Sequence, residues 1–318
     1  MRGDQLAGLV AISITSLLWG TTGTAATFAP GVSPLAIGSA ALGIGGLLQA
    51  LIAVPALRAE RTALRPRWRA VLVGGVAVAV YPLAFYSSMH LAGVAIGSVV
   101  SLASAPIASG LLERVVDARR LSRWWLLSAG LGVLGSILLC ASKTDAPGGS
   151  SWETLAGVVL GLVAGLTYAV YSWAAHRLMG SGVGRAASMG SVFGLGGLLL
   201  MPVLAVTGSP ILSSAGNLSV AAYMALVPMF LGYVLFGYGL TKVSASTATT
   251  VTLTEPAIAT VLAVVVVGER LGPVGWAGLA IIGAVLVVLA VAPTNEKVVS
   301  DAVSGRGAEA RRYLDRAR

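Results

Sequence analysis

The sequence predicts an all-α integral membrane protein whose ten transmembrane helices form two inverted five-helix repeats. Composition is the first observation behind this prediction. Hydrophobic residues make up 56% of the 318 residues and charged residues only 10%, whereas an ordinary soluble domain has about 25% charged residues. This composition excludes a soluble enzyme and a disordered chain. The single cysteine, Cys140, also excludes an intramolecular disulfide scaffold.

The second observation is a series of ten apolar segments, each close to the ~20 residues that a helix needs to cross a bilayer. The loops between them are too short to hold a soluble domain. A polar linker, 143–151, follows the fifth segment, which predicts a first repeat over 1–148, a second over 149–292 and a cytoplasmic basic tail over 293–318. The ten expected spans are 7–29, 34–57, 70–90, 92–112, 124–142, 152–175, 186–207, 218–240, 243–267 and 273–292.

The third observation is the distribution of positive charge. If successive spans alternate in direction, all of the 21 Lys and Arg residues except Lys143 and Arg270 fall on the side of the N-terminus. Cytoplasmic loops carry the excess of Lys and Arg, so we expect a multi-pass protein of the inner (plasma) membrane with both termini in the cytoplasm. The net charge of +9 is then an orientation signal. The expected partner is the lipid bilayer, and no nucleic acid is expected.

The two halves of the chain resemble each other at a nearly constant offset. Leu6-Ala7-Gly8 recurs as Leu155-Ala156-Gly157, and Pro106 in the fourth span matches Pro256 in the ninth. Each half has five spans, an odd number, so the halves must insert with opposite orientation. Inverted repeats of this kind are typical of secondary transporters, whose substrate site lies near the membrane midplane between the repeats.

Aromatic residues concentrate in spans one, three, six and eight, which the repeat pairs as one with six and three with eight. If these spans line one central cavity, their rings would meet there, and Thr22 would join them because it shares a helix face with Trp19. Packing between helices or against lipid is an equally open interpretation. The candidate substrate-binding residues in these spans are Trp19, Thr22, Tyr86, Tyr168, Tyr171 and Phe236.

Glu255 is the one ionisable residue near the middle of a span, and such residues are functional candidates because they are costly in a membrane. Burial favours its neutral form, so the carboxyl could bind and release a proton, or contact a substrate. Alternatively, it could bond backbone groups that Pro256 leaves free. Thr252 lies three residues earlier on the same face and is a further candidate for substrate binding. Helix packing is an alternative role for this threonine.

The ten spans in two five-helix halves, together with several short motifs, resemble the EamA family of the drug/metabolite transporter superfamily over residues 5–292. The first half departs from the family pattern, because Ala105-Pro106 replaces a Glu-Pro pair. The resemblance implies that the aromatic-rich helices line the substrate cavity and that amino acids or similar metabolites are exported. The motifs are Leu18-Trp19-Gly20, Thr254-Glu255-Pro256, Gly268-Glu269-Arg270-Leu271 and the glycine-rich segment 275–283.

The sequence thus predicts a secondary transporter, and not an enzyme, that exports small metabolites such as amino acids by alternating access. No Walker A motif is present, so a proton gradient or the substrate's own gradient would supply the energy. The alternatives are a multidrug or organic-cation exporter and, more remotely, an intramembrane enzyme or a non-transporting membrane interaction protein. No cofactor and no metal site are expected. The oligomeric state is open, and a homodimer is one candidate.

Overall fold

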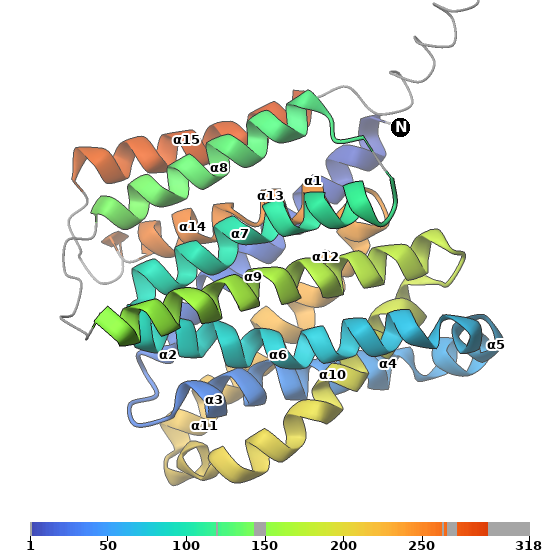
Figure 1. Ribbon diagram of the computed structural model, residues 1–318. Helices are drawn as coiled ribbons and strands as arrows, with labels where there is room; N and C mark the ends of the chain where they lie inside the picture. The colour runs from blue at the N-terminus through green and yellow to red at the C-terminus, as the bar shows by residue number, and fades with distance from the viewer. Residues whose placement is uncertain (1, 119, 143–150, 263, 266–271, 292–318) are drawn as a thin grey trace, which may run out of the picture.

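A computed structural model describes residues 2–118, 120–142, 151–262, 264–265 and 272–291. Within these ranges every regular element is helical, and the long helices lie side by side (Figure 1). The all-helical prediction is therefore confirmed. Nearly all of the predicted linker and the whole predicted tail, 293–318, lie outside the described residues.

The first half of the chain contains five helical stretches. Two of them are built from consecutive shorter elements. The elements are α1 (Arg2–Gly20) with α2 (Thr22–Ala26); α3 (Pro34–Gly38), the π-helix η1 (Ser39–Ile44) and α4 (Gly45–Ala59); α6 (Trp68–Ala92); α7 (Val94–Val115); and α8 (Arg123–Ser142). The short α5 (Arg61–Leu64) and the 3-10 turn η2 (Arg65–Arg67) connect α4 to α6.

The second half begins with two long uninterrupted helices and then becomes irregular. Its elements are α9 (Ser151–Gly180); α10 (Arg185–Thr207); the 3-10 turn η3 (Ser209–Ser213); α11 (Ala215–Met224), the π-helix η4 (Ala225–Leu231) and α12 (Gly232–Leu240); α13 (Ala245–Val251); α14 (Thr254–Leu262); and α15 (Pro273–Val291).

Eight helical stretches in the described part are long and apolar enough to cross a membrane, and the segment Arg123–Leu139 is a shorter apolar helix. Large hydrophobic side chains also point outward, among them Leu51, Leu126 and Val287. An exterior of this kind suits lipid rather than water, because soluble proteins rarely expose large apolar patches. The structure thus supports a multi-pass membrane protein.

The ninth expected span, 243–267, is not one continuous helix. Within its described residues, α13 ends at Val251 and α14 begins at Thr254. The cause is Pro256, which has no N–H to donate to the carbonyl four residues earlier, that of Thr252, and whose ring clashes with it. That carbonyl accepts a hydrogen bond from the N–H of Glu255 at 2.9 Å instead. The turn residues Thr252 and Leu253 therefore interrupt the span, and Glu255 lies in the first turn of the helix that follows.

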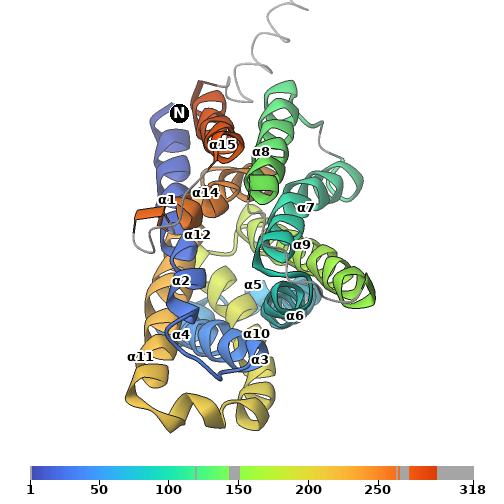
Figure 2. The same cartoon turned by 90° about the vertical axis from the view of Figure 1, so that its left-hand side faces the viewer.

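The helices pack as two groups that face each other (Figure 2). We call α1, α12, α13 and α14 the α1 group, and α6, α7 and α9 the α9 group. Within the groups, α1 contacts α12 and α14, while α9 contacts α6 and α7. Outside them, α4 packs against α10, and α8 packs against α15. Each group therefore combines a helix from one half of the chain with helices from the other half.

Glycines permit the closest approaches within the α9 group. A Cβ atom on Gly165 of α9 would lie 2.6 Å from the Ser101 carbonyl oxygen and 3.1 Å from the Ala105 nitrogen of α7. These are backbone atoms and cannot rotate away. Small residues at such positions let membrane helices pack backbone to backbone. The sequence Gly157-x-x-x-Gly161-x-x-x-Gly165 is therefore explained by packing.

We predict that Gly165→Ala lowers the stability of the folded protein by about 1–3 kcal/mol, the usual cost of overpacking a tight contact. The measurement is the free energy of unfolding, or the melting temperature, in detergent. Gly130→Ala in α8 is the matched control, because nothing lies within 4 Å of the added Cβ. Equal stability of the two variants would contradict the packing role.

Candidate functional site

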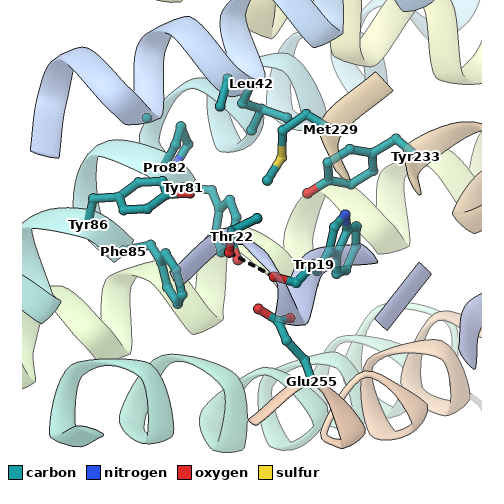
Figure 3. A pocket seen from close by; sticks show the side chains of 12 residues that line it. Trp19, Thr22, Leu42, Tyr81, Pro82, Phe85, Tyr86, Met229, Tyr233 and Glu255 are labelled. Atoms are coloured by element: carbon teal, nitrogen blue, oxygen red, sulfur yellow. Dashed lines mark hydrogen bonds between the residues drawn. The ribbon is translucent and has the colours of Figure 1, made fainter. Parts of the chain in front are cut away.

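The candidate site is built around the side chain of Glu255 in the first turn of α14. This residue is only 7% exposed, and its Oε2 atom is buried without a hydrogen-bond partner among the described residues. Figure 3 shows the carboxylate pointing into the space between Phe85, Thr22 and Trp19. An unpaired buried carboxylate is unfavourable, so this group requires a proton, a water molecule or a ligand that the described residues do not replace.

Two cavities meet at this carboxylate, and both are lined by Trp19, Thr22, Phe85 and Glu255. The smaller has a volume of about 20 Å³, enough for one water molecule. The larger, about 90 Å³, extends along α2, α7 and α14. The additional lining residues of the smaller cavity are Gly38, Ala41, Leu42, Tyr81, Pro82, Tyr86, Met229 and Tyr233. Those of the larger are Gly20, Gly23, Met89, Ser98, Val99, Leu102, Leu139, Pro256, Ala259 and Thr260.

The indole of Trp19 is held in place by the π-helix η4. The N–H of Gly232 bonds to the carbonyls of Val227 and Met229 rather than to that of Pro228. Trp19 Nε1 donates to that carbonyl at 2.9 Å. Gly232 also leaves room for the ring, because a Cβ there would lie 2.8 Å from Nε1. A π-helix at a functional site is a common device, and here it orients a cavity wall.

A packed aromatic cluster lies next to the cavities and joins the two helix groups. The ring of Trp19 lies 6.0 Å from Tyr168, 4.8 Å from Tyr233 and 5.4 Å from Phe236, between centroids. The hydroxyls of Tyr171 and Tyr233 are 2.7 Å apart, and that of Tyr168 is 2.8 Å from Thr252 Oγ1. These two contacts connect α9 with the α1 group.

The structure places the predicted site residues in two sets. Trp19, Thr22, Tyr86 and Glu255 line the smaller cavity, and all but Tyr86 also line the larger. The other four belong to the aromatic cluster behind the smaller cavity. Tyr168, Tyr171 and Phe236 are fully buried there, and Thr252 is bonded to Tyr168.

Sequence reasoning did not select Tyr81, Phe85 or Tyr233 as site residues. The concentration of aromatic residues in spans three and eight was a signal for all three. Tyr81 and Phe85 are four residues apart and therefore share a face of α6, and their rings stack at 5.5 Å. Tyr233 lines the smaller cavity while its hydroxyl bonds to Tyr171.

The hydroxyl groups around the interrupted span serve the backbone. Thr250 Oγ1 donates to the Ser246 carbonyl at 2.8 Å, Thr252 Oγ1 to the Thr249 carbonyl at 2.9 Å, and Thr254 Oγ1 to the Val251 carbonyl at 2.8 Å. Polar backbone groups at membrane depth must be satisfied inside the protein. The many Ser and Thr residues here are therefore explained by the break between α13 and α14.

A second buried carboxylate, that of Glu113, joins the two groups at the end of the bundle where α1 begins. It is 4% exposed, and it accepts hydrogen bonds at 2.9 Å from both the backbone N–H and the hydroxyl of Ser246. Its partners lie at the start of α13, so α7 and α13 are tied together. Other polar contacts at this end include those of Asp117 with Trp173 and Arg177. No local pattern of residues predicts this contact, because it depends on tertiary structure.

Within the described residues, no group of three His, Cys, Asp or Glu side chains could hold a metal ion. The chemistry of the site therefore rests on one carboxylate, several aromatic rings and a few hydroxyls.

Comparison of the sequence with known protein families identifies the family of the chain. The EamA-like transporter family matches the chain twice, over residues 6–141 and 155–291. The chain belongs to this family. The resemblance to the EamA family is thus confirmed. The description of the family and the names of its relatives indicate a transporter.

Two relatives and one solved structure extend this result. The chain is 32% identical over 292 residues to the "Uncharacterized transporter YwfM" of Bacillus subtilis (strain 168), covering 92% of this chain and 96% of that protein. It is 24% identical to the "Probable terminal-alkyne amino-acid exporter" of Streptantibioticus cattleyicolor, covering 87% and 94%. A crystal structure with 20% identity superposes with a TM-score of 0.69 over 91% of this chain and 95% of that one, which shows a shared fold.

We predict that Tyr171→Phe lowers stability by about 1–3 kcal/mol, because it leaves the buried Tyr233 hydroxyl without its partner. The double variant Tyr171→Phe/Tyr233→Phe should recover most of this loss, since neither polar group then remains. The measurement is a double-mutant cycle of unfolding free energies in detergent. Additive losses in the double variant would contradict a coupled hydroxyl pair.

Proposed function

We propose that this EamA-like protein is a secondary transporter that exports small metabolites such as amino acids by alternating access at the Glu255 cavities. The observation that carries the proposal is the buried carboxylate at the junction of two cavities, between two helix groups. Ligand sites are typically concave and mostly apolar with a few polar groups that fix orientation. The relative named as an amino-acid exporter supports amino acids as the first substrates to test.

We also propose that the chain has ten membrane spans in two inverted repeats, 1–148 and 149–292. The packing pattern supports this arrangement, because exchanging each span for its repeat partner preserves the contacts. The contacts of α1 with α12 and α14 become those of α9 with α6 and α7, while the α4–α10 and α8–α15 pairs map onto themselves. The family match to each half separately supports it too.

Alternating access is supported by the difference between the two ends of the bundle. The larger cavity separates α1 and α14 from α6 and α7. Towards the start of α1, in contrast, α13 packs against α7 and α9, and Glu113 ties it to α7. The positive charge favours this tied end as the cytoplasmic one, with both termini there, in the plasma membrane. The described conformation is then closed towards the cytoplasm.

Energy coupling is the third part of the proposal. A carboxyl in a low-dielectric cavity can be held either protonated or paired with a cation, but not bare. A proton and a substrate amino group would therefore compete for Glu255, which couples their movements in opposite directions. The second candidate function, export of larger organic cations or drugs, is favoured by the same carboxylate among aromatic rings.

We predict that Glu255→Gln abolishes uptake driven by a pH gradient in proteoliposomes, because the amide cannot bind and release a proton. Counterflow of labelled amino acids in the absence of a pH gradient is measured on the same proteoliposomes. Glu153→Gln is the control, since it removes an exposed carboxyl at the start of α9, away from the cavities. Gradient-dependent transport by the Glu255 variant would exclude this residue as the coupling group.

We predict that locking α7 to α13 stops transport, because the tied end must open for substrate to enter from the cytoplasm. Cysteines at positions 113 and 246, in a Cys140→Ser background, are joined with a short bifunctional thiosulfonate. Counterflow should fall to background and return after reduction.

The two single-cysteine variants treated with the same reagent control for modification alone. Full counterflow in the cross-linked double variant would show that these helices do not separate during transport.

A further inference from the structure

We propose that the Glu255 cavities bind the positively charged amino group of the substrate and have no counterpart for a carboxylate. Small primary amines are then ligands of this site as well as amino acids. This inference rests on the proposed function above, because it assigns the substrate chemistry of the same site. It goes further by stating which half of a zwitterion the protein binds.

The charges of the lining residues are the first observation. Glu255 is the single charged residue lining either cavity in the described part of the chain, and no Lys, Arg or His lines them. A carboxylate brought into such a space would lie near a like charge without a cation to neutralise it. An ammonium group would instead pair with the Oε2 atom of Glu255, which has no partner among the described residues.

The second observation is that three hydrogen-bond donors on the cavity walls, those of Trp19, Thr22 and Thr260, are already in use. Trp19 Nε1 donates to the Pro228 carbonyl. Thr22 Oγ1 donates to the Trp19 carbonyl at 2.7 Å, and Thr260 Oγ1 to the Pro256 carbonyl at 2.8 Å. Towards a ligand the oxygens of the two threonines can therefore act only as acceptors, and that of Thr22 is also hydrogen-bonded to Tyr86. An ammonium group has three donors and no acceptor, which matches this surface.

The start of α14 does not reverse this preference. A helix N-terminus often binds anions through its free backbone N–H groups. Here the N–H of Glu255 bonds to the Thr252 carbonyl, and Pro256 has no N–H. What remains of the helix dipole stabilises negative charge in the first turn, and the residue there is Glu255 itself. The start of α14 therefore offers no free anion site beside Glu255, because the side chain of Glu255 already occupies the first turn.

Aromatic rings and size complete the description of the ligand. Trp19 and Phe85 line both cavities, and Tyr81, Tyr86 and Tyr233 line the smaller. The faces of such rings attract cations and pack against apolar groups. The larger cavity, at about 90 Å³, lies far below the roughly 300–1,000 Å³ of drug-sized sites. The geometry therefore favours a small amine with a short apolar side chain.

The test is a binding measurement on the purified full chain in nanodiscs with three matched probes. Valine carries both charged groups, 2-methylpropylamine keeps only the amine, and 3-methylbutanoate keeps only the carboxylate. We expect titration calorimetry to show the amine binding at least as tightly as valine. The carboxylate should bind at least tenfold more weakly. Equal or tighter binding of 3-methylbutanoate, or no binding of the amine, would overturn the inference.

Variants connect the preference to Glu255. Glu255→Gln should weaken binding of the amine at least tenfold, and Glu255→Asp should recover part of it because the charge is restored. Glu153→Gln should bind the amine like the unmodified chain. Circular dichroism and gel filtration show whether each variant is folded. Unchanged amine binding by a folded Glu255→Gln variant would also overturn the inference.

Counterflow with the same probes separates this inference from the proposed function. If valine is exchanged but the amine is neither bound nor exchanged, the inference is rejected and the proposed transport function is retained. If the amine binds but no probe is exchanged, transport of these substrates is rejected and the inferred preference for an amino group is retained.

Discussion

The buried, unpaired carboxylate of Glu255 is the constraint on which the rest of the site depends. A second buried carboxylate, Glu113, has a different environment, because it accepts two hydrogen bonds from Ser246. Glu113 is thereby satisfied by the fold and acts as a tie between helices. Glu255 Oε2 has no such partner among the described residues and gains stability only from a proton, a water molecule or a ligand. The same functional group thus has two roles, set by its hydrogen bonds.

The break between α13 and α14 is what allows this carboxylate to reach the cavities. An uninterrupted helix would satisfy its own backbone and present side chains at a regular spacing. Here Thr252 and Thr254 bond to carbonyls around the turn, which makes the break tolerable at membrane depth. Its partner in the proposed repeat, α7, continues past Pro106 and carries the buried Ala105 at the matching position. One half of the chain therefore supplies the acid, and the other supplies a packing surface.

Much of the fold could be predicted because it follows from apolar length and helical periodicity. The segments 152–175 and 186–207 contain no internal breaker that ends them, and both lie within long helices, α9 and α10. The expected repeat predicted that Trp19, Tyr86, Tyr168, Tyr171 and Phe236 meet. The rings of all but Tyr86 are in contact with one another, whereas the ring of Tyr86 contacts that of Phe85. The interruption at Thr252 was not predicted, because a proline does not always end a membrane helix. Pro82, for example, lies inside α6 without ending it. The contact between Glu113 and Ser246 joins residues 133 positions apart, so no local sequence pattern predicts it.

In the proposed alternating access, the aromatic cluster and the Glu113 contact are the interactions that must separate when the tied end of the bundle opens. The polar contacts across the groups include two hydroxyl pairs, the bond between His176 Nδ1 and the Leu240 carbonyl, and one satisfied carboxylate. Among the described residues no salt bridge joins the two groups. Hydrogen bonds between neutral groups exchange for bonds to water with a net change of about 0.5–1.5 kcal/mol each, and those to a carboxylate with about 1.5–3 kcal/mol each. Opening therefore costs a few such terms, within the range that binding of a ligand can offset. Separation of α13 from α7 would also expose the path to Glu255, so the occupant of that carboxylate influences the energy of the opening.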